Sequence, residues 1–283
     1  MQLADQLPEK RLARRSFEQA AQSYDAAAVL QQEVAQRLLE RLDLMKLEPA
    51  RVLDLGCGTG YCIPELMSRY KRADIIALDI ARPMLEQARR RGRWLHRPRC
   101  VCGDAERLPF EDASFDLVFS NLMLQWCVDI DAAFAELHRV LRPGGLLLFT
   151  SFGPDTLKEL RDSWAQVDGD THVNAFLDMH DVGDALVKTR FADPVMDVER
   201  ITVTYPDVWK LMRELKQIGA HNVTAGRPRG LTGKSHMQQL VNAYEHYRQA
   251  GVLPASYEIV NGHAWATAVS GEAMVSIEGL KAP

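Results

Sequence analysis

The stretch "VLDLGCGTGY", residues 52–61, decides the fold of this chain. An apolar run ends at Asp54, and glycines then occupy every second position at Gly56, Gly58 and Gly60. Glycine has no Cβ atom, so a ligand can come close to the backbone N–H groups of such a turn. A glycine-rich turn after a strand places its ligand at the carboxyl end of that strand. The stretch therefore predicts an α/β protein that binds a ligand at a sheet edge.

The segments that follow alternate between short apolar runs and helical patterns. Strands are expected at 51–55, 74–79, 99–102, 115–120 and 145–151, with helices at 61–70, 82–92 and 131–141 between them. "LRPGG" at 141–145 is a stop-and-turn signal before the fifth strand. Buried strands that alternate with helices indicate a mostly parallel sheet with helices on both faces.

Beyond residue 151 the alternation loosens, and strands are expected near 195–204 and 257–267. Two helical patterns between them, about 206–218 and 233–249, indicate a helical insertion between the last two strands. We expect four parts: an N-terminal helical arm over the cofactor site, a core, an insertion over the acceptor site, and a final strand with its tail. Their boundaries are 1–45, 46–205, 206–250 and 251–283.

The composition excludes several classes of protein. The chain has 283 residues, 47% apolar and 25% charged, and a net charge of −4, which disfavours a nucleic-acid or membrane binder. No segment has the pattern of a signal peptide or a membrane span. The five cysteines lie in apolar segments without metal-ligand spacing, so they predict reduced core thiols, no metal and a cytoplasmic protein.

Two carboxylates identify the kind of ligand. The spacing G-x-G-x-G, without a following Lys-Ser/Thr pair, disfavours a phosphate site. Asp79 ends the second strand, where its carboxylate can accept hydrogen bonds from ribose hydroxyls, and Asp104 follows the third strand, near an adenine amine. Asp79 could instead cap a helix and Asp104 could form a turn, but together with the glycines they predict a nucleoside pocket.

"VLDLGCGTG", "ALDIARPML", "GDAERLPFEDASFDLVFSN" and "ELHRVLRPGG" resemble the successive motifs of Rossmann-like class I S-adenosylmethionine-dependent methyltransferases. This resemblance implies that S-adenosylmethionine is the cofactor and methyl donor. It also implies that four groups of residues, in chain order, contact the amino-acid end, the ribose, the adenine and the sulfonium of this cofactor. The residues implied are Asp54, Gly56, Cys57, Gly58 and Gly60, then Asp79 and Ile80, then Met84, Asp104 and Ala105, and finally Asn121 and Leu122.

The flanking segments 16–39, 159–177 and 211–232, together with "SNLMLQWC", resemble the malonyl-[acyl-carrier protein] O-methyltransferase family of biotin biosynthesis. The resemblance implies methylation of the free carboxyl group of a malonyl thioester, carried by acyl carrier protein or by coenzyme A. The methyl ester would mask the charge, so that fatty-acid elongation accepts the malonyl group as the primer for pimeloyl synthesis.

A carboxylate acceptor is ionised at pH 7 and needs no general base, but it needs a cation or a neutral donor to hold it. His172 and Arg227 are the candidates, although each could be an ordinary loop residue. Tyr24 could cover the cofactor or pack in the core. Gln125 and Trp126 follow the fourth strand on the acceptor side, and Trp126 could equally be a core residue.

Other functions and the docking of the carrier protein remain open at this stage. C-terminal segments also resemble a mitochondrial assembly factor that hydroxylates an arginine of a partner protein, and small-molecule C- or O-methyltransferases share 51–151. The arginine-rich stretch 88–99 is expected on a solvated face at the edge opposite the cofactor. The cations expected to meet a carrier protein are Lys10, Arg11, Arg14, Arg15, Arg229 and Lys234.

Overall fold

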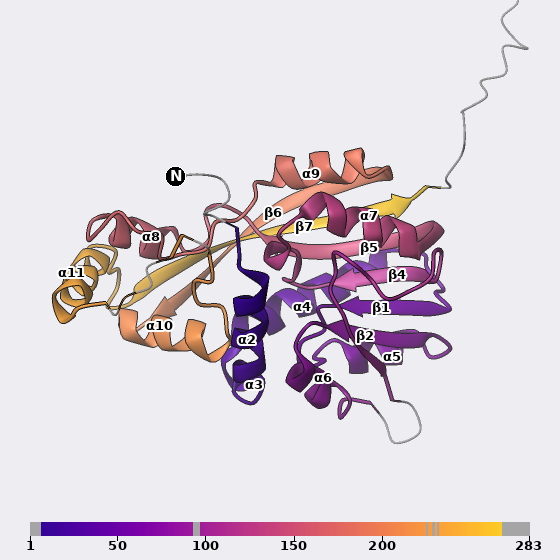
Figure 1. Ribbon diagram of the computed structural model, residues 1–283, viewed down its shortest axis with the longest axis horizontal. Coiled ribbons are helices and arrows are strands. Elements are labelled where there is room, and N and C mark those ends of the chain that lie inside the picture. Colours follow the sequence, from indigo (N-terminus) through magenta and orange to yellow (C-terminus); the bar gives the residue numbers. More distant parts are fainter. Residues whose placement is uncertain (1–6, 93–96, 225, 228–229, 231, 268–283) are drawn as a thin grey trace, which may run out of the picture.

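The computed structural model describes residues 7–92, 97–224, 226–227, 230 and 232–267, which form one seven-stranded sheet with helices on both faces (Figure 1). The strand order is β3-β2-β1-β4-β5-β7-β6. The strands are β1 (Arg51–Leu55), β2 (Asp74–Asp79), β3 (Arg99–Cys102), β4 (Phe115–Ser120), β5 (Leu141–Phe152), β6 (Phe191–Tyr205) and β7 (Leu253–Ala266).

The first five strands are parallel to one another, and β7 runs antiparallel to both β5 and β6. β1 and β4 are almost wholly buried because both faces of a parallel sheet are covered. The strand order reverses between β1 and β4, and such a reversal opens a crevice at the carboxyl ends of the strands. The expected Rossmann-like methyltransferase fold is confirmed.

The helices of the core divide into two layers. Leu38 and Leu39 of α4 pack with Leu66 of α5 against one face of the sheet. On the other face, Phe134 of α7 and Leu186 of α9 pack against strand residues of the core. The helices of these layers are α4 (Val29–Arg41), α5 (Ile63–Arg69), α6 (Arg82–Ala88), α7 (Ile130–Val140) and α9 (Met179–Lys188).

The expected insertion lies between β6 and β7. It contains α10 (Val208–Gln217) and α11 (Lys234–Glu245), and Figure 1 shows both helices with α8 (Lys158–Ala165) around the long ends of these strands. Leu211, Leu240 and Tyr244 of the insertion are buried with Tyr257 of β7 in one apolar cluster. The insertion therefore shares a core with the sheet.

The N-terminal arm was expected to be helical, but the position of its first helix was not predicted. This helix, α2 (Lys10–Ala20), is followed by α3 (Tyr24–Ala27), and both lie beside the end of α10. The backbone nitrogen of Glu9 donates to the Val223 carbonyl at 2.8 Å. A Cβ atom at Gly219, where φ is +72°, would lie 3.0 Å from the Ser16 carbonyl oxygen, so only glycine allows this close approach. The arm and the insertion thus pack directly on each other.

Two further expectations need correction. β5 begins at Leu141 rather than at 145, because Leu141 pairs with Phe115 before an irregularity that includes Gly144 at φ +77°. α6 ends at Ala88, and the chain turns back, so Arg91 donates to the Thr59 carbonyl at 3.2 Å in the glycine turn. The prediction that Arg91 lies at the opposite edge was wrong, while Arg93 in the same stretch lies outside the described residues.

The five cysteines form no disulfide and differ in exposure. All five thiols are free, and Cys57 and Cys62 are buried as expected, but Cys102 is exposed. Among the described residues, no helix combines the length and the apolar character that crossing a membrane requires.

Candidate functional site

A cleft opens over the carboxyl ends of the strands, between the sheet and a roof formed by the arm and the start of the insertion. Its empty space, including the open mouth, is about 940 Å³. Phe17 and Tyr24 of the arm and Ile218 after α10 line the roof. A smaller pocket adjoins the cleft, and the two share the residues Tyr24, Gln31, Gly56, Gly58 and Asn121.

The three glycines of the turn have different roles. The backbone nitrogen of Gly56 donates to the Leu78 carbonyl at 2.8 Å, which ties the turn to β2. A Cβ atom at Gly58 would meet nothing within 4 Å, so this residue faces open space in the cleft. A Cβ atom at Gly60 would lie 2.9 Å from the Ala88 Cα atom. Gly60 therefore allows close packing on α6 and does not line the cleft, in contrast to its expected contact with the cofactor.

Asp79 is hydrogen-bonded at the start of α6, and its position is compatible with the expected ribose contact. Its Oδ1 accepts a hydrogen bond from the Ala81 nitrogen at 2.8 Å, at the start of α6, and its Oδ2 accepts one from the Gly58 nitrogen at 3.0 Å. Burial raises the pKa of Asp79 to about 6, and these backbone bonds oppose the rise. Each carboxylate oxygen can accept a second bond, so the ribose hydroxyls can still bind.

Asp54 lacks a partner for one of its oxygens. The residue is 3% exposed, and its buried Oδ2 has no hydrogen-bond partner among the described residues. Burial, with a contribution from the charge of Asp79, raises the pKa of Asp54 to about 7. Asp54 lines the smaller pocket with Cys57 and Thr59. A buried, unpaired carboxyl group fits a cationic ligand group, and the α-ammonium of S-adenosylmethionine supplies one.

The opposite end of the cleft carries the residues expected at the adenine, namely Ile80, Met84, Asp104 and Ala105. Lys10 of the arm reaches into this end, and its Nζ lies 2.7 Å from Asp104 Oδ2 and 2.8 Å from Glu106 Oε2. The sequence analysis placed Lys10 on a docking surface because its spacing on a surface helix does not reveal these partners. The ion pairs instead fasten the arm over the cleft.

A chain of hydrogen bonds fixes the floor below the expected position of the sulfonium. Leu122 has a φ of +49°, which is costly for a side chain of its size. Its nitrogen donates to Thr150 Oγ1 at 2.9 Å, and that hydroxyl donates to Asn121 Oδ1 at 2.9 Å. Asn121 Nδ2 donates to the Gln31 carbonyl at 3.1 Å. The network holds Asn121 and Leu122 in the cleft and links β4 and β5 to α4.

Tyr24 lies between the cleft and the smaller pocket. Burial raises the pKa of its hydroxyl above the usual range, and the charges of Asp79 and Asp25 add to the effect. The hydroxyl therefore stays protonated and has no hydrogen-bond partner within the described part of the chain. This position suits the expected cover over the cofactor.

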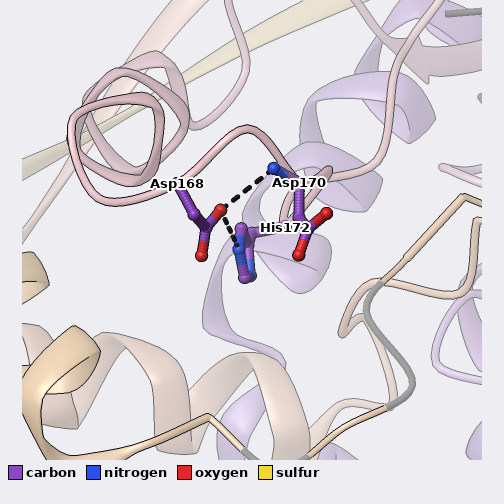
Figure 2. A group of neighbouring side chains, drawn as sticks. All are labelled: Asp168, Asp170 and His172. Carbon is purple, nitrogen blue, oxygen red and sulfur yellow. Dashed lines mark hydrogen bonds and ion pairs between the residues drawn. The ribbon is translucent and has the colours of Figure 1, made fainter.

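His172 and Arg227, the expected acceptor residues, do not line the cleft. His172 stacks on Trp164 with ring centroids 3.7 Å apart, and its Nε2 lies 2.8 Å from Asp168 Oδ1 (Figure 2). The Arg227 guanidinium donates to Glu9 Oε1 at 2.6 Å and to the Thr224 carbonyl at 2.8 Å. Both side chains have structural partners, so a role at the acceptor stays a prediction.

Figure 2 also shows Asp170 beside this pair, and ligand atoms of Asp168, Asp170 and His172 lie within 4.8 Å of one another. Asp168 Oδ1 accepts from both the Asp170 nitrogen and His172, so the loop is organised by its own hydrogen bonds. The cluster gives no indication of a metal requirement.

Comparisons with known proteins agree with this geometry. The family described as "Methyltransferase domain" matches residues 53–149. The malonyl-[acyl-carrier protein] O-methyltransferase of Laribacter hongkongensis is 54% identical, over 91% of this chain and 89% of that protein. The enzyme of the same name from Halorhodospira halophila is 48% identical over 96% of both chains. The crystal structure of the YcgJ protein from Bacillus subtilis, at 18% identity, covers 82% of this chain and 99% of that chain with a TM-score of 0.59, which shows the fold alone.

Replacing Asp79 tests the ribose contact. Asp79→Ala should weaken S-adenosylmethionine binding by about 1.5–3 kcal/mol, the usual range for hydrogen bonds to a charged group. Titration calorimetry measures the affinity, and circular dichroism checks that the variant is folded. Asp112→Ala, whose native side chain is 79% exposed, is the matched control. Unchanged affinity in a folded Asp79 variant would contradict the assignment.

Proton release tests the partner of Asp54. Without ligand, Asp54 is largely protonated below its pKa of about 7, whereas a neighbouring ammonium favours the charged form and lowers that pKa. Binding of S-adenosylmethionine at pH 6.5 should therefore release up to about one proton, and the release should fade as the pH rises through 7. Calorimetry in buffers with different ionisation enthalpies measures the release. Asp54→Asn should reduce it, and an equal release in that variant would place the ammonium elsewhere.

Proposed function

This chain belongs to the malonyl-[acyl-carrier protein] O-methyltransferase family, and on that basis we propose that it methylates the free carboxyl group of a malonyl thioester on acyl carrier protein. The proposal rests on the 54% sequence identity between this chain, over 91% of its length, and the Laribacter hongkongensis enzyme of that name. A match over 91% of the chain extends well beyond the shared methyltransferase core at 53–149.

S-adenosylmethionine supplies a methyl group on a positively charged sulfur. Asp54, Asp79 and the glycine turn would hold its amino-acid and ribose groups, and the end of the cleft near Asp104 would hold its adenine. The acceptor carboxylate is already ionised at neutral pH, so no residue has to remove a proton from it. The residues of the chain have to align the two groups and exclude water.

The roof is suited to exclude water from the reaction. Phe17 of the arm meets Trp126 edge to face, with ring centroids 5.0 Å apart. Ser23 donates to the Gln217 carbonyl at 2.9 Å, which joins the arm to the end of α10. In a dry site, the attraction between the carboxylate and the sulfonium is less screened than in water.

The methyl ester removes the charge from the malonyl group, and we propose that the product primes pimeloyl synthesis for biotin. The alternative of arginine hydroxylation on a partner protein is not favoured by the names of the related proteins. Malonyl-coenzyme A presents the same malonyl thioester, so the choice between the two carriers depends on the protein surface around the cleft.

Cations around the cleft form the proposed docking surface. Arg11 and Arg15 of α2 are exposed and have no ion pair within the described residues, whereas Lys10 is bound to Asp104, and Arg14 pairs with Glu18 at 2.8 Å. Arg229 lies outside the described residues. Further exposed cations on the insertion are Lys210, Arg213, Lys216 and Lys234. Arg11 and Arg15 are therefore the cations of the arm that remain free to meet an acidic carrier protein.

The reaction itself can be tested by mass spectrometry. Wild-type protein with S-adenosylmethionine should add one methyl group to malonyl-acyl carrier protein and none to the acetyl form. With no catalytic base to ionise, the rate should be flat between pH 7 and 9 and fall only at acid pH. A rate that rises steadily through this range would indicate a hydroxyl, thiol or amine acceptor.

Charge reversal tests the docking surface. Arg11→Glu with Arg15→Glu should lower kcat/KM for malonyl-acyl carrier protein roughly tenfold at low ionic strength, because these cations speed encounter with an acidic partner. Malonyl-coenzyme A should be affected less, and added salt should reduce the difference.

The matched control reverses Lys71 and Arg72, which are exposed and precede β2 at the opposite edge of the sheet. Their reversal should leave the activity toward both thioesters unchanged. A selective loss of carrier-protein activity in the control would move the docking surface to that edge.

A further inference from the structure

Part of the cleft remains free once the cofactor groups have been assigned. Asp54 marks the amino-acid end, Asp79 the ribose and Asp104 the adenine. The remaining lining lies beyond the ends of β4 and β5 and under the start of the insertion. It consists of Met123, Gln125, Trp126, Phe152, Ile218 and Ala220. On the proposed function, this chamber receives the malonyl group.

The chamber contains no cation among the described residues that line it. The cleft has two cations, Lys10 and Arg14, and both lie toward β3. Lys10 is bound to Asp104, and Arg14 pairs with Glu18 and lies near Cys102 at the end of β3. Among the described residues that line the chamber, the groups able to hold the acceptor carboxylate are therefore neutral donors.

Gln125 is the donor whose orientation the structure fixes. It belongs to the short helix Leu124–Trp126 that follows β4. Its Nε2 donates to the Leu122 carbonyl at 2.7 Å, and Ser151 Oγ lies 3.5 Å from its Oε1. A primary amide has two N–H groups, so one remains for a ligand. Because the Leu122 carbonyl can only accept, a flipped amide would place its oxygen against that carbonyl and lose the 2.7 Å bond, so this orientation is the favoured one.

The other neutral donors are less suitable. Trp126 packs its ring on Phe17, and the amide of Asn121 belongs to the network with Thr150 and Gln31. The Tyr24 hydroxyl lies close enough to Asp79 and Asp25 for their charges to raise its pKa, so an anion beside it would be repelled. Both hydrogen-bond partners of Gln125, the Leu122 carbonyl and the Ser151 hydroxyl, are uncharged.

We infer that Gln125 binds the acceptor carboxylate through its free N–H, and that Ser151 is a positioning residue that keeps this N–H directed to the acceptor. This inference rests on the proposed function and names the residue that selects a carboxylate. A neutral donor suits the reaction because it orients one oxygen without neutralising the charge of the attacking oxygen. A cation would stabilise the bound carboxylate more than the partly neutralised transition state.

The first experiment compares malonyl- and acetyl-acyl carrier protein, which differ by the carboxylate. In Gln125→Leu, kcat/KM for malonyl-acyl carrier protein should fall about 10- to 150-fold, the loss of one hydrogen bond to a charged group. The inhibition constant of the acetyl form should stay the same. S-adenosylhomocysteine affinity, measured by calorimetry, should also stay the same and shows that the variant is folded. Gln36→Leu, an exposed glutamine on α4, is the matched control.

The second experiment uses Gln125→Glu, which has the same shape and adds a negative charge. Its activity should be below that of Gln125→Leu at pH 8 and recover as the pH falls and the new carboxyl group takes up a proton. Wild-type protein should show no such recovery. Ser151→Ala should give a smaller loss than Gln125→Leu and none in the Gln125→Leu background, because Ser151 acts through Gln125.

The outcomes separate the inference from the proposed function. If Gln125→Leu weakens the acetyl and malonyl forms equally, Gln125 shapes the chamber and does not recognise the carboxylate, and the inference is wrong. If the wild-type protein is active and Gln125→Leu retains full activity, the inference alone is overturned. Wild-type protein that binds S-adenosylhomocysteine but forms no methyl ester would overturn the proposed function, and the inference with it.

Discussion

Two buried carboxyl groups at the reversal of strand order, Asp54 and Asp79, are the feature on which the site depends. Burial raises the pKa of Asp54 to about 7, far above its ordinary value, and the two groups lie close enough for the charge of Asp79 to add to this rise. In the ligand-free protein, their contribution to stability is present below that ordinary value and is lost as the pH rises through about 6 to 7. A bound cationic cofactor offsets the cost of ionising two neighbouring buried carboxyl groups. Cofactor binding and the stability of the core are therefore coupled.

The roof depends on contacts between parts of the chain that are far apart in sequence. The arm meets the insertion through Glu9 and Arg227, through Ser16 and His221 at 3.1 Å, and at Gly219. It meets the core through Lys10, which is bound to Asp104. The arm also packs on the core through Ala20 and Ala21, which are buried with Met84 of α6 in one apolar cluster. The roof is therefore joined to the insertion mainly by polar contacts and to the core by both polar and apolar contacts.

Much of the fold could be predicted because the signals are local. Apolar runs bounded by turns identified the strands, and the helical patterns between the strands identified α5, α6 and α7. α2 was missed because its buried stripe consists of small residues, Ala13, Ser16 and Ala20, within a basic sequence. The site was less predictable at its acceptor end, since loop side chains such as His172 take partners that sequence spacing does not define. The glycine turn and its carboxylates follow strand ends, so their meeting point was determined by the topology.

The charges around the cleft also determine the order in which the ligands can bind. Asp54, Asp79, Asp104 and Glu106 line the cofactor side, and Lys10 is the cation paired with the last two. A malonyl carboxylate entering the empty cleft would approach these carboxylates with no sulfonium to offset them. On the proposed function, the ammonium of bound S-adenosylmethionine would lie at Asp54 and its sulfonium would face the chamber at Gln125. The carboxylates of the cofactor side would then attract the cofactor and disfavour the acceptor until the methyl donor is in place.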